Sequence, residues 1–107
     1  MTPKEFVQLF HKEKSDLLNI YFNNLKNTEV GLDIESLNLT EDQIDIMKGI
    51  IDKVLTDTMY TILLGIEGEA SIGGIQQKYK LYDENGDKLT GCGEIEEYAY
   101  EYFQEFE

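Results

Sequence analysis

The C-terminal end of the chain carries the pattern that most constrains its fold. Apolar side chains recur there at helical intervals: Ile95, Tyr98, Ala99, Tyr102, Phe103 and Phe106. Glutamates follow the opposite side: Glu94, Glu97, Glu101 and Glu105. An apolar stripe opposite a charged stripe is typical of a helix that packs one face on a core. The sequence therefore predicts an amphipathic C-terminal helix over residues 94–106.

A first helix is predicted at the other end of the chain. Thr2 and Glu5 form a capping box, and the apolar residues after them recur at helical spacing. The pattern fades near Asn27, so the predicted helix covers residues 3–26. Residues 29–39 are predicted to be a connector. Three apolar side chains of this connector are expected to pack against the core: Leu32, Ile34 and Leu37.

A second helix is predicted from another capping box, formed by Thr40 and Gln43. Its apolar face is expected to consist of Ile44, Met47, Ile50, Ile51, Val54 and Leu55. The helix is expected to end near residues 57–58. That boundary stays open, because Met59–Ile66 is continuously apolar and also suits a longer helix.

Three strands are predicted between the second helix and the last. Residues 59–67 contain several residues that favour extended backbone, and two glycines that weaken a helix. Residues 75–82 alternate in polarity, Asp83–Gly86 is a strong turn signal with Gly86 suited to a left-handed position, and residues 87–90 return as a short strand. Together with the helices, these strands predict an α+β fold with a three-stranded antiparallel meander.

The length of 107 residues fits one domain, so we expect a single α+β domain over residues 1–107. The single cysteine, Cys92, excludes an internal disulfide and suits a reducing compartment. No apolar run is long enough to cross a membrane, and the first residues lack the apolar stretch of a signal peptide. We therefore expect a cytoplasmic protein.

The charge of the chain indicates what kind of partner it meets. There are 22 acidic residues, nine lysines and no arginine, which gives a net charge of −13. The segment from Gly91 to Glu107 has six glutamates and no lysine. Such a field repels nucleic acid and anionic membranes and attracts basic surfaces. The sequence therefore predicts a basic protein partner, with no nucleic acid and no membrane.

The predicted partner-binding residues belong to the last helix: Glu94, Glu97, Tyr100, Glu101 and Glu105. Like charges four residues apart on a helix cost a few tenths of a kcal/mol per pair, an expense that a purely structural surface need not carry. Tyr100 lies off the apolar stripe, and exposed tyrosine beside carboxylates is typical of binding hot spots. The alternative is a solvated helix face that only promotes solubility.

The sequence contains few residues that could support catalysis or bind a cofactor. His11 and Cys92 lie in no family motif for nucleophilic catalysis, and one histidine with one cysteine supplies a zinc site poorly. Asp83–Lys88 lacks most of the EF-hand ligand set, and Gly68–Gly74 lacks the Gly-Lys-Ser/Thr ending of a phosphate loop. We expect no enzyme, cofactor or metal site. An enzyme that uses clustered carboxylates with a divalent metal remains an alternative.

As a whole, the chain resembles the small acidic immunity proteins of bacteria, which neutralise polymorphic or contact-dependent toxins. The resemblance rests on size, acidity and Glu-rich aromatic surface elements; Leu63–Gly68 and Ser71–Gly74, within Tyr60–Leu89, look like a family signature. It implies a non-enzymatic inhibitor that covers the basic active site of a nuclease-like toxin. The alternative is a homo-oligomeric structural or regulatory protein, whose subunits pair through Met59–Ile66 and the hairpin edge.

Overall fold

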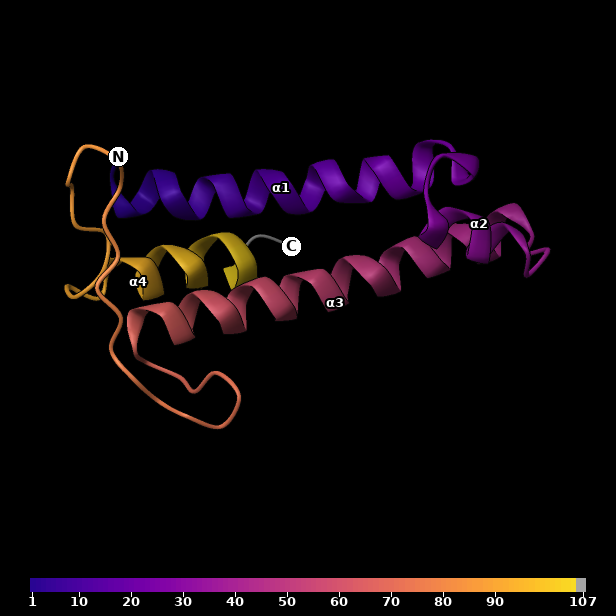
Figure 1. Ribbon diagram of the computed structural model, residues 1–107. Helices are drawn as coiled ribbons and strands as arrows, with labels where there is room; N and C mark the ends of the chain where they lie inside the picture. The colour runs from indigo at the N-terminus through magenta and orange to yellow at the C-terminus, as the bar shows by residue number, and fades with distance from the viewer. Residues whose placement is uncertain (106–107) are drawn as a thin grey trace. The chain divides into compact units, whose positions relative to one another are not determined.

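The computed structural model describes residues 1–105 and contains four α-helices in that range: α1 (Pro3–Asn23), α2 (Glu29–Glu35), α3 (Glu41–Glu67) and α4 (Glu94–Tyr100) (Figure 1). A short 3₁₀ helix, η1 (Leu25–Asn27), precedes α2, and a π-helical turn, η2 (Glu101–Glu105), continues α4. The described residues form no sheet, only two isolated β-bridges. The predicted α+β fold is therefore wrong, and the described chain is all-α.

The described chain divides into two compact units. Unit 1 combines Met1–His11 with the described residues from Thr56 onward, and unit 2 is Lys12–Leu55. Each long helix, α1 and α3, contributes one end to each unit. The single domain expected from the chain length stays a prediction.

Both predicted capping boxes are confirmed. The backbone N–H of Glu5 donates to Thr2 Oγ1 at 3.1 Å, and the N–H of Thr2 donates to Glu5 Oε1 at 3.1 Å. At the start of α3, the N–H of Gln43 donates to Thr40 Oγ1 at 3.2 Å, and the N–H of Thr40 to Gln43 Oε1 at 2.9 Å. Because each box satisfies two backbone donors within four residues, it sets the start of a helix locally.

The predicted strand over residues 59–67 is wrong, because α3 continues through it to Glu67. Leu63 is fully buried in this stretch, so tertiary packing of the helix outweighs the β preference of its neighbours. The helix ends instead at Gly68, which has a φ of 88°. The N–H of Glu69 donates to Leu64 O at 2.9 Å, and the N–H of Gly68 to Gly65 O at 3.1 Å. This pair of bonds is a Schellman cap, which needs a left-handed residue at this position.

The predicted connector over residues 29–39 is also wrong, because it contains α2. Thr28 caps this helix: its hydroxyl oxygen accepts the N–H of Gly31 at 2.9 Å. Ile34 is buried as expected, whereas Leu32 and Leu37 are exposed. In unit 2, Leu18 is buried as well, and Lys14 Nζ pairs with Asp52 Oδ1 at 3.0 Å.

The two remaining predicted strands, over residues 75–82 and 87–90, are corrected to a long loop between α3 and α4. Only the bridges Ile72–Ile75 and Tyr82–Lys88 occur within it. Two short strands alone rarely persist as a sheet without a third strand or a helix to cover them. The predicted turn is confirmed: Asp83 O accepts the N–H of Gly86 at 3.1 Å, and Gly86 has a φ of 86°.

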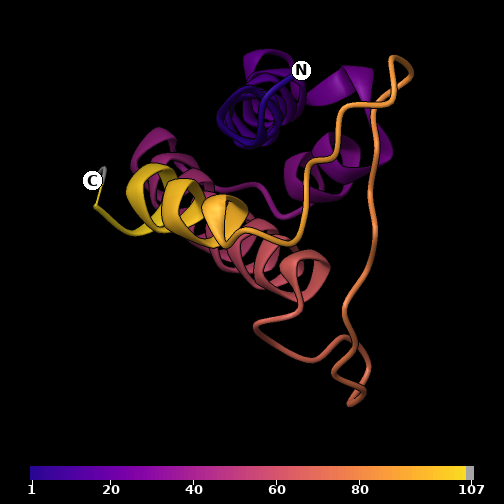
Figure 2. The same ribbon diagram turned by 90° about the vertical axis from the view of Figure 1, so that its left-hand side faces the viewer.

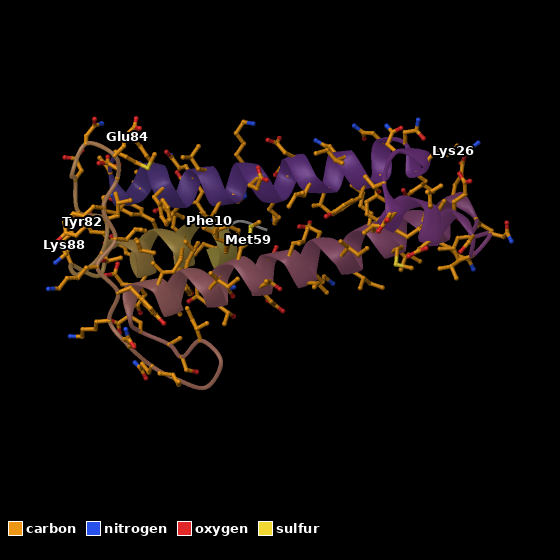
Figure 3. All side chains as sticks on the ribbon, in the orientation of Figure 1. Phe10, Lys26, Met59, Tyr82, Glu84 and Lys88 are labelled. Carbon is orange, nitrogen blue, oxygen red and sulfur yellow. The ribbon has the colours of Figure 1, made fainter. Side chains whose placement is uncertain are left out.

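The core of unit 1 gathers side chains from three helical segments and the loop. Its buried members are Val7, Leu63, Leu89, Ile95, Ala99 and Phe103. Within this unit, α4 lies beside the first turns of α1 and the last turns of α3 (Figures 1 and 2). Phe10 on α1 and Met59 on α3 pack against the same cluster from its edge (Figure 3). Phe106, the last member of the predicted apolar stripe, lies outside the described residues.

Candidate functional site

A hollow of about 450 Å³ lies on unit 1, next to the C-terminal helix. It is lined by Tyr60, Gly93, Glu96, Glu97, Tyr100, Glu101 and Glu105. Tyr60 comes from α3, and the other residues from the start of α4, its body and η2. We call these residues the acidic hollow. Four of the seven are glutamates, so the surface is strongly anionic.

The start of α4 is held in place by a buried carboxylate from α3. Glu67 is 5% exposed; its Oε2 accepts the N–H of Ile95 at 3.1 Å, and its Oε1 accepts the N–H of Gly91 at 2.5 Å. Gly93, the residue at the N-terminal cap of α4, has no side chain that could accept these backbone N–H groups. A carboxylate at a helix N-terminus also interacts favourably with the helix dipole. Glu67 therefore fixes where the acidic hollow begins.

The other end of the hollow is anchored to α1. Gln8 Nε2 donates to the Tyr102 hydroxyl at 2.8 Å, and the ring of His11 lies 5.8 Å from that of Tyr102 and 5.6 Å from that of Phe103. Because the opposite face of α4 and η2 is buried through Ile95, Ala99 and Phe103, the glutamates between these positions are directed outwards. Packing on one face thus presents the carboxylates on the other.

No lysine of the described chain neutralises these carboxylates. The ion pairs within residues 1–105 join Met1 to Asp83 and Asp87, Lys12 to Asp16, and Lys14 to Asp52. Burial raises the pKa of the Tyr60 phenol, and the nearby Glu96 carboxylate and Tyr100 raise it further. Tyr60 therefore stays a neutral hydrogen-bonding group in the lining of a negative surface, and Tyr100, in the same lining, is 51% exposed.

Four of the five predicted partner-binding residues come together at this site: Glu97, Tyr100, Glu101 and Glu105. The fifth, Glu94, is exposed at the first position of α4 and does not line the hollow. The predicted site residues leave out Tyr60, Gly93 and Glu96, although Glu96 belongs to the acidic C-terminal segment that the sequence indicates. Tyr60 lies in the stretch predicted as a strand, and the helical alternative for residues 59–67 brings it to the site. Glu107, part of the acidic C-terminal segment, lies outside the described residues.

The chemistry of the hollow is that of a cation receptor. Carboxylates accept charge-assisted hydrogen bonds from lysine and arginine, and tyrosine rings bind the apolar stems or the faces of such cations. In the described part of the chain, no three His, Cys, Asp or Glu side chains are grouped so as to hold a metal ion. His11 packs on aromatic rings, and Cys92 is exposed with a free thiol.

The sequence matches no protein-family model, no curated protein and no solved structure. None of the helices in residues 1–105 combines the length and the apolar character needed to cross a membrane.

Proposed function

We propose that this protein is a non-enzymatic binding module that receives lysine and arginine side chains of a basic protein partner in the acidic hollow. The observation that carries the proposal is the grouping of Glu96, Glu97, Glu101 and Glu105 around two tyrosines, with no ion pair to a lysine of residues 1–105. Such a surface steers a cationic partner towards it and pairs with it on arrival.

The placement of two of these carboxylates supports a functional role. Glu101 and Glu105 stand one turn apart at the C-terminal end of the helix, where no basic residue is present. The helix dipole disfavours negative charge at that end, and the two like charges repel each other. Acidic residues that serve only solubility can be placed where they destabilise the helix less. The position of Glu101 and Glu105 therefore supports a role in binding.

The partner class that we propose is a nuclease-like toxin domain. An enzyme that binds nucleic acid neutralises phosphates with lysine and arginine, so its active site is a cationic surface. A protein that covers such a site with glutamates competes directly with the substrate. This is the mode of action expected from the resemblance to immunity proteins.

The test is binding and inhibition with a panel of basic bacterial nuclease toxin domains, measured by calorimetry and by nucleic-acid cleavage. The variant Glu97→Lys with Glu101→Lys reverses two carboxylates of the hollow. We expect it to weaken binding at least about tenfold, and we expect wild-type affinity to fall steeply as salt rises from ~20 to ~200 mM, where screening becomes strong.

The matched control is Glu41→Lys with Asp45→Lys on α3. These two exposed residues have the same i,i+4 spacing, and the variant changes the net charge by the same amount. It changes residues of unit 2, whereas the hollow is lined by residues of unit 1. Equal effects of the two variants would mean that only overall charge matters, and the hollow would lose its assigned role.

Self-association is the second candidate function. The sequence suggests that subunits pair through Met59–Ile66. This segment is helical and its Leu63 is buried in the core, so it does not offer a strand for such pairing. A different feature favours it: Ile46, Ile50 and Val54 follow successive turns of α3 and are each more than half exposed. Sedimentation of the wild type and of Ile50→Lys tests it; a single monomeric species for both would exclude it.

A further inference from the structure

The loop between α3 and α4 contains a run of backbone whose N–H groups bond to no other part of the described chain. Residues 76–80 are all exposed, and none of their backbone N–H groups donates a hydrogen bond within residues 1–105. The loop runs along the outside of unit 1 as a drawn-out segment (Figure 2). A row of free donors and acceptors on extended backbone is a template for another strand.

The hydrogen bonds of this segment define its two edges. Tyr79 O accepts the Thr90 hydroxyl at 2.6 Å, the N–H of Leu81 donates to Thr90 Oγ1 at 3.1 Å, and Leu81 O accepts the N–H of Leu89 at 2.8 Å. The odd-numbered residues thus face the segment 87–90. Successive backbone groups of an extended strand point to opposite edges. The backbone groups of Lys78, Lys80 and Tyr82 therefore face the free edge.

The side chains along this segment alternate between two faces in the same way. Lys78 and Lys80 are two residues apart, so in an extended segment their side chains share one face. The Gln76 side chain, which donates to Gly68 O at 2.9 Å, belongs to that face as well. Two of the chain's nine lysines therefore belong to one face of this segment, in a protein with a net charge of −13.

A second copy of this chain fits the free edge poorly. If two copies pair in antiparallel fashion through their even-numbered residues, only one register aligns the whole run 76–82 with its equivalent. In that register Lys78 of each copy lies opposite Lys80 of the other, so the strand pair contains two lysine–lysine contacts. Shifting the register by one step in either direction places Lys78 or Lys80 opposite its own equivalent. Like charges directly opposite each other destabilise a strand pair. The charge pattern selects a different strand, with acidic side chains opposite the lysines.

We propose that residues 76–82 are a second docking site, independent of the acidic hollow, which binds an extended segment of a partner protein by strand addition. The incoming strand pairs with the outward backbone groups of Lys78, Lys80 and Tyr82 and places carboxylates at alternating positions beside Lys78 and Lys80. Backbone pairing provides the affinity, and the two lysines select the partner's charge. None of these residues lines the hollow.

The probe is a seven-residue peptide in which glutamate alternates with valine, compared with the same peptide carrying lysine in place of glutamate. Each is titrated into ¹⁵N-labelled protein to ~5 mM, which detects a Kd near 1 mM. We expect the acidic peptide to shift the amide signals of residues 76–82, and the lysine peptide to bind there about fivefold more weakly. Shifts of the lysine peptide at residues 96–105 report on the acidic hollow and are counted separately.

Four variants separate charge from backbone pairing. Lys78→Glu with Lys80→Glu should exchange the preference of residues 76–82 between the two peptides. Lys78→Pro removes an outward N–H and should weaken binding beyond the charge-matched Lys78→Gln. The control Gln77→Pro removes an inward N–H and should not, and the same spectra show whether each variant remains folded.

The proposal is overturned if no signal of residues 76–82 shifts with the acidic peptide, or if both peptides shift them equally. Concentration-dependent shifts of residues 76–82 without peptide would identify a second copy as the occupant, and would overturn it as well.

Discussion

Glu67 and Ile95 are joined by a hydrogen bond that spans 28 residues of sequence: the carboxylate at the end of α3 accepts the N–H of Ile95 in the first turn of α4 at 3.1 Å. The same carboxylate accepts the N–H of Gly91. Ile95 is fully buried, so its N–H would otherwise lie unsatisfied next to the core. The position of the acidic hollow therefore depends on a residue that does not line it.

Truncation of Glu67 tests this dependence. Glu67→Ala should lower the free energy of unfolding by about 1–3 kcal/mol, because the buried N–H of Ile95 is left unsatisfied. It should also speed amide hydrogen exchange over residues 94–101, because the start of α4 loses its cap. Urea unfolding and exchange measurements check this. Glu69→Ala, at an exposed position two residues away, should change stability by less than about 0.5 kcal/mol. Similar losses for both variants would contradict the capping role.

The carboxylates at the C-terminal end of the hollow should be unfavourable for folding. Glu101→Gln with Glu105→Gln removes a like-charge pair and two charges disfavoured by the helix dipole. We expect the free energy of unfolding to rise by about 0.5–1 kcal/mol. Glu94→Gln, at the other end of the helix, should have the opposite sign, because negative charge is favourable there. Denaturant midpoints at low salt measure both, and a stability loss in the double variant would argue against this account.

The α-amino group of Met1 makes stability depend on pH. Hydrogen bonds to Asp83 at 2.7 Å and to Asp87 at 3.0 Å raise its pKa from 8.0 to about 10. A raised pKa means that the ammonium stabilises the fold fully below pH 8.0 and loses this effect as the pH rises through about 10. The same contact lowers the pKa of Asp83. The stabilisation that the ionised Asp83 carboxylate contributes is therefore present at neutral pH and is lost in acid.

Acetylation of the α-amino group isolates this effect from the titration of other groups. The free-amine chain, with Met1 verified by mass spectrometry, should have a higher urea midpoint than the acetylated chain below pH 8.0, and the difference should vanish above about pH 10. A difference that stays constant across this window would assign the effect to something other than the ammonium.

Two helical glycines should respond in opposite directions to alanine. A Cβ at Gly31 would overlap the backbone of Leu25, which cannot easily move, so Gly31→Ala should lose at least about 2 kcal/mol of stability. A Cβ at Gly49 meets nothing within 4 Å, and this residue lies inside α3. Gly49→Ala should gain about 0.5–1 kcal/mol, because alanine is the better helix former. Thermal unfolding of both variants measures these changes. A change in stability of the same sign in both variants would contradict the packing at Gly31.

The sequence by itself determined the features that depend on a few neighbouring residues. The capping boxes at Thr2 and Thr40, the turn at Asp83–Gly86, and the outward glutamates of the last helix all follow from bonds or side-chain intervals within about one helical turn. Glu97, Tyr100, Glu101 and Glu105 could therefore be predicted as neighbours on one surface.

Only the tertiary structure decided whether residues 59–67 form a helix or a strand, since an apolar run suits either. Burial of Leu63 against α1 and α4 selects the helix, and this choice brings Tyr60 to the hollow and Glu67 to the start of α4. It also leaves the outer edge of residues 76–82 without a neighbouring strand, because residues 59–67 are helical and no other described segment pairs there. Local bonds begin a helix, whereas long-range packing determines how far it extends and what it meets.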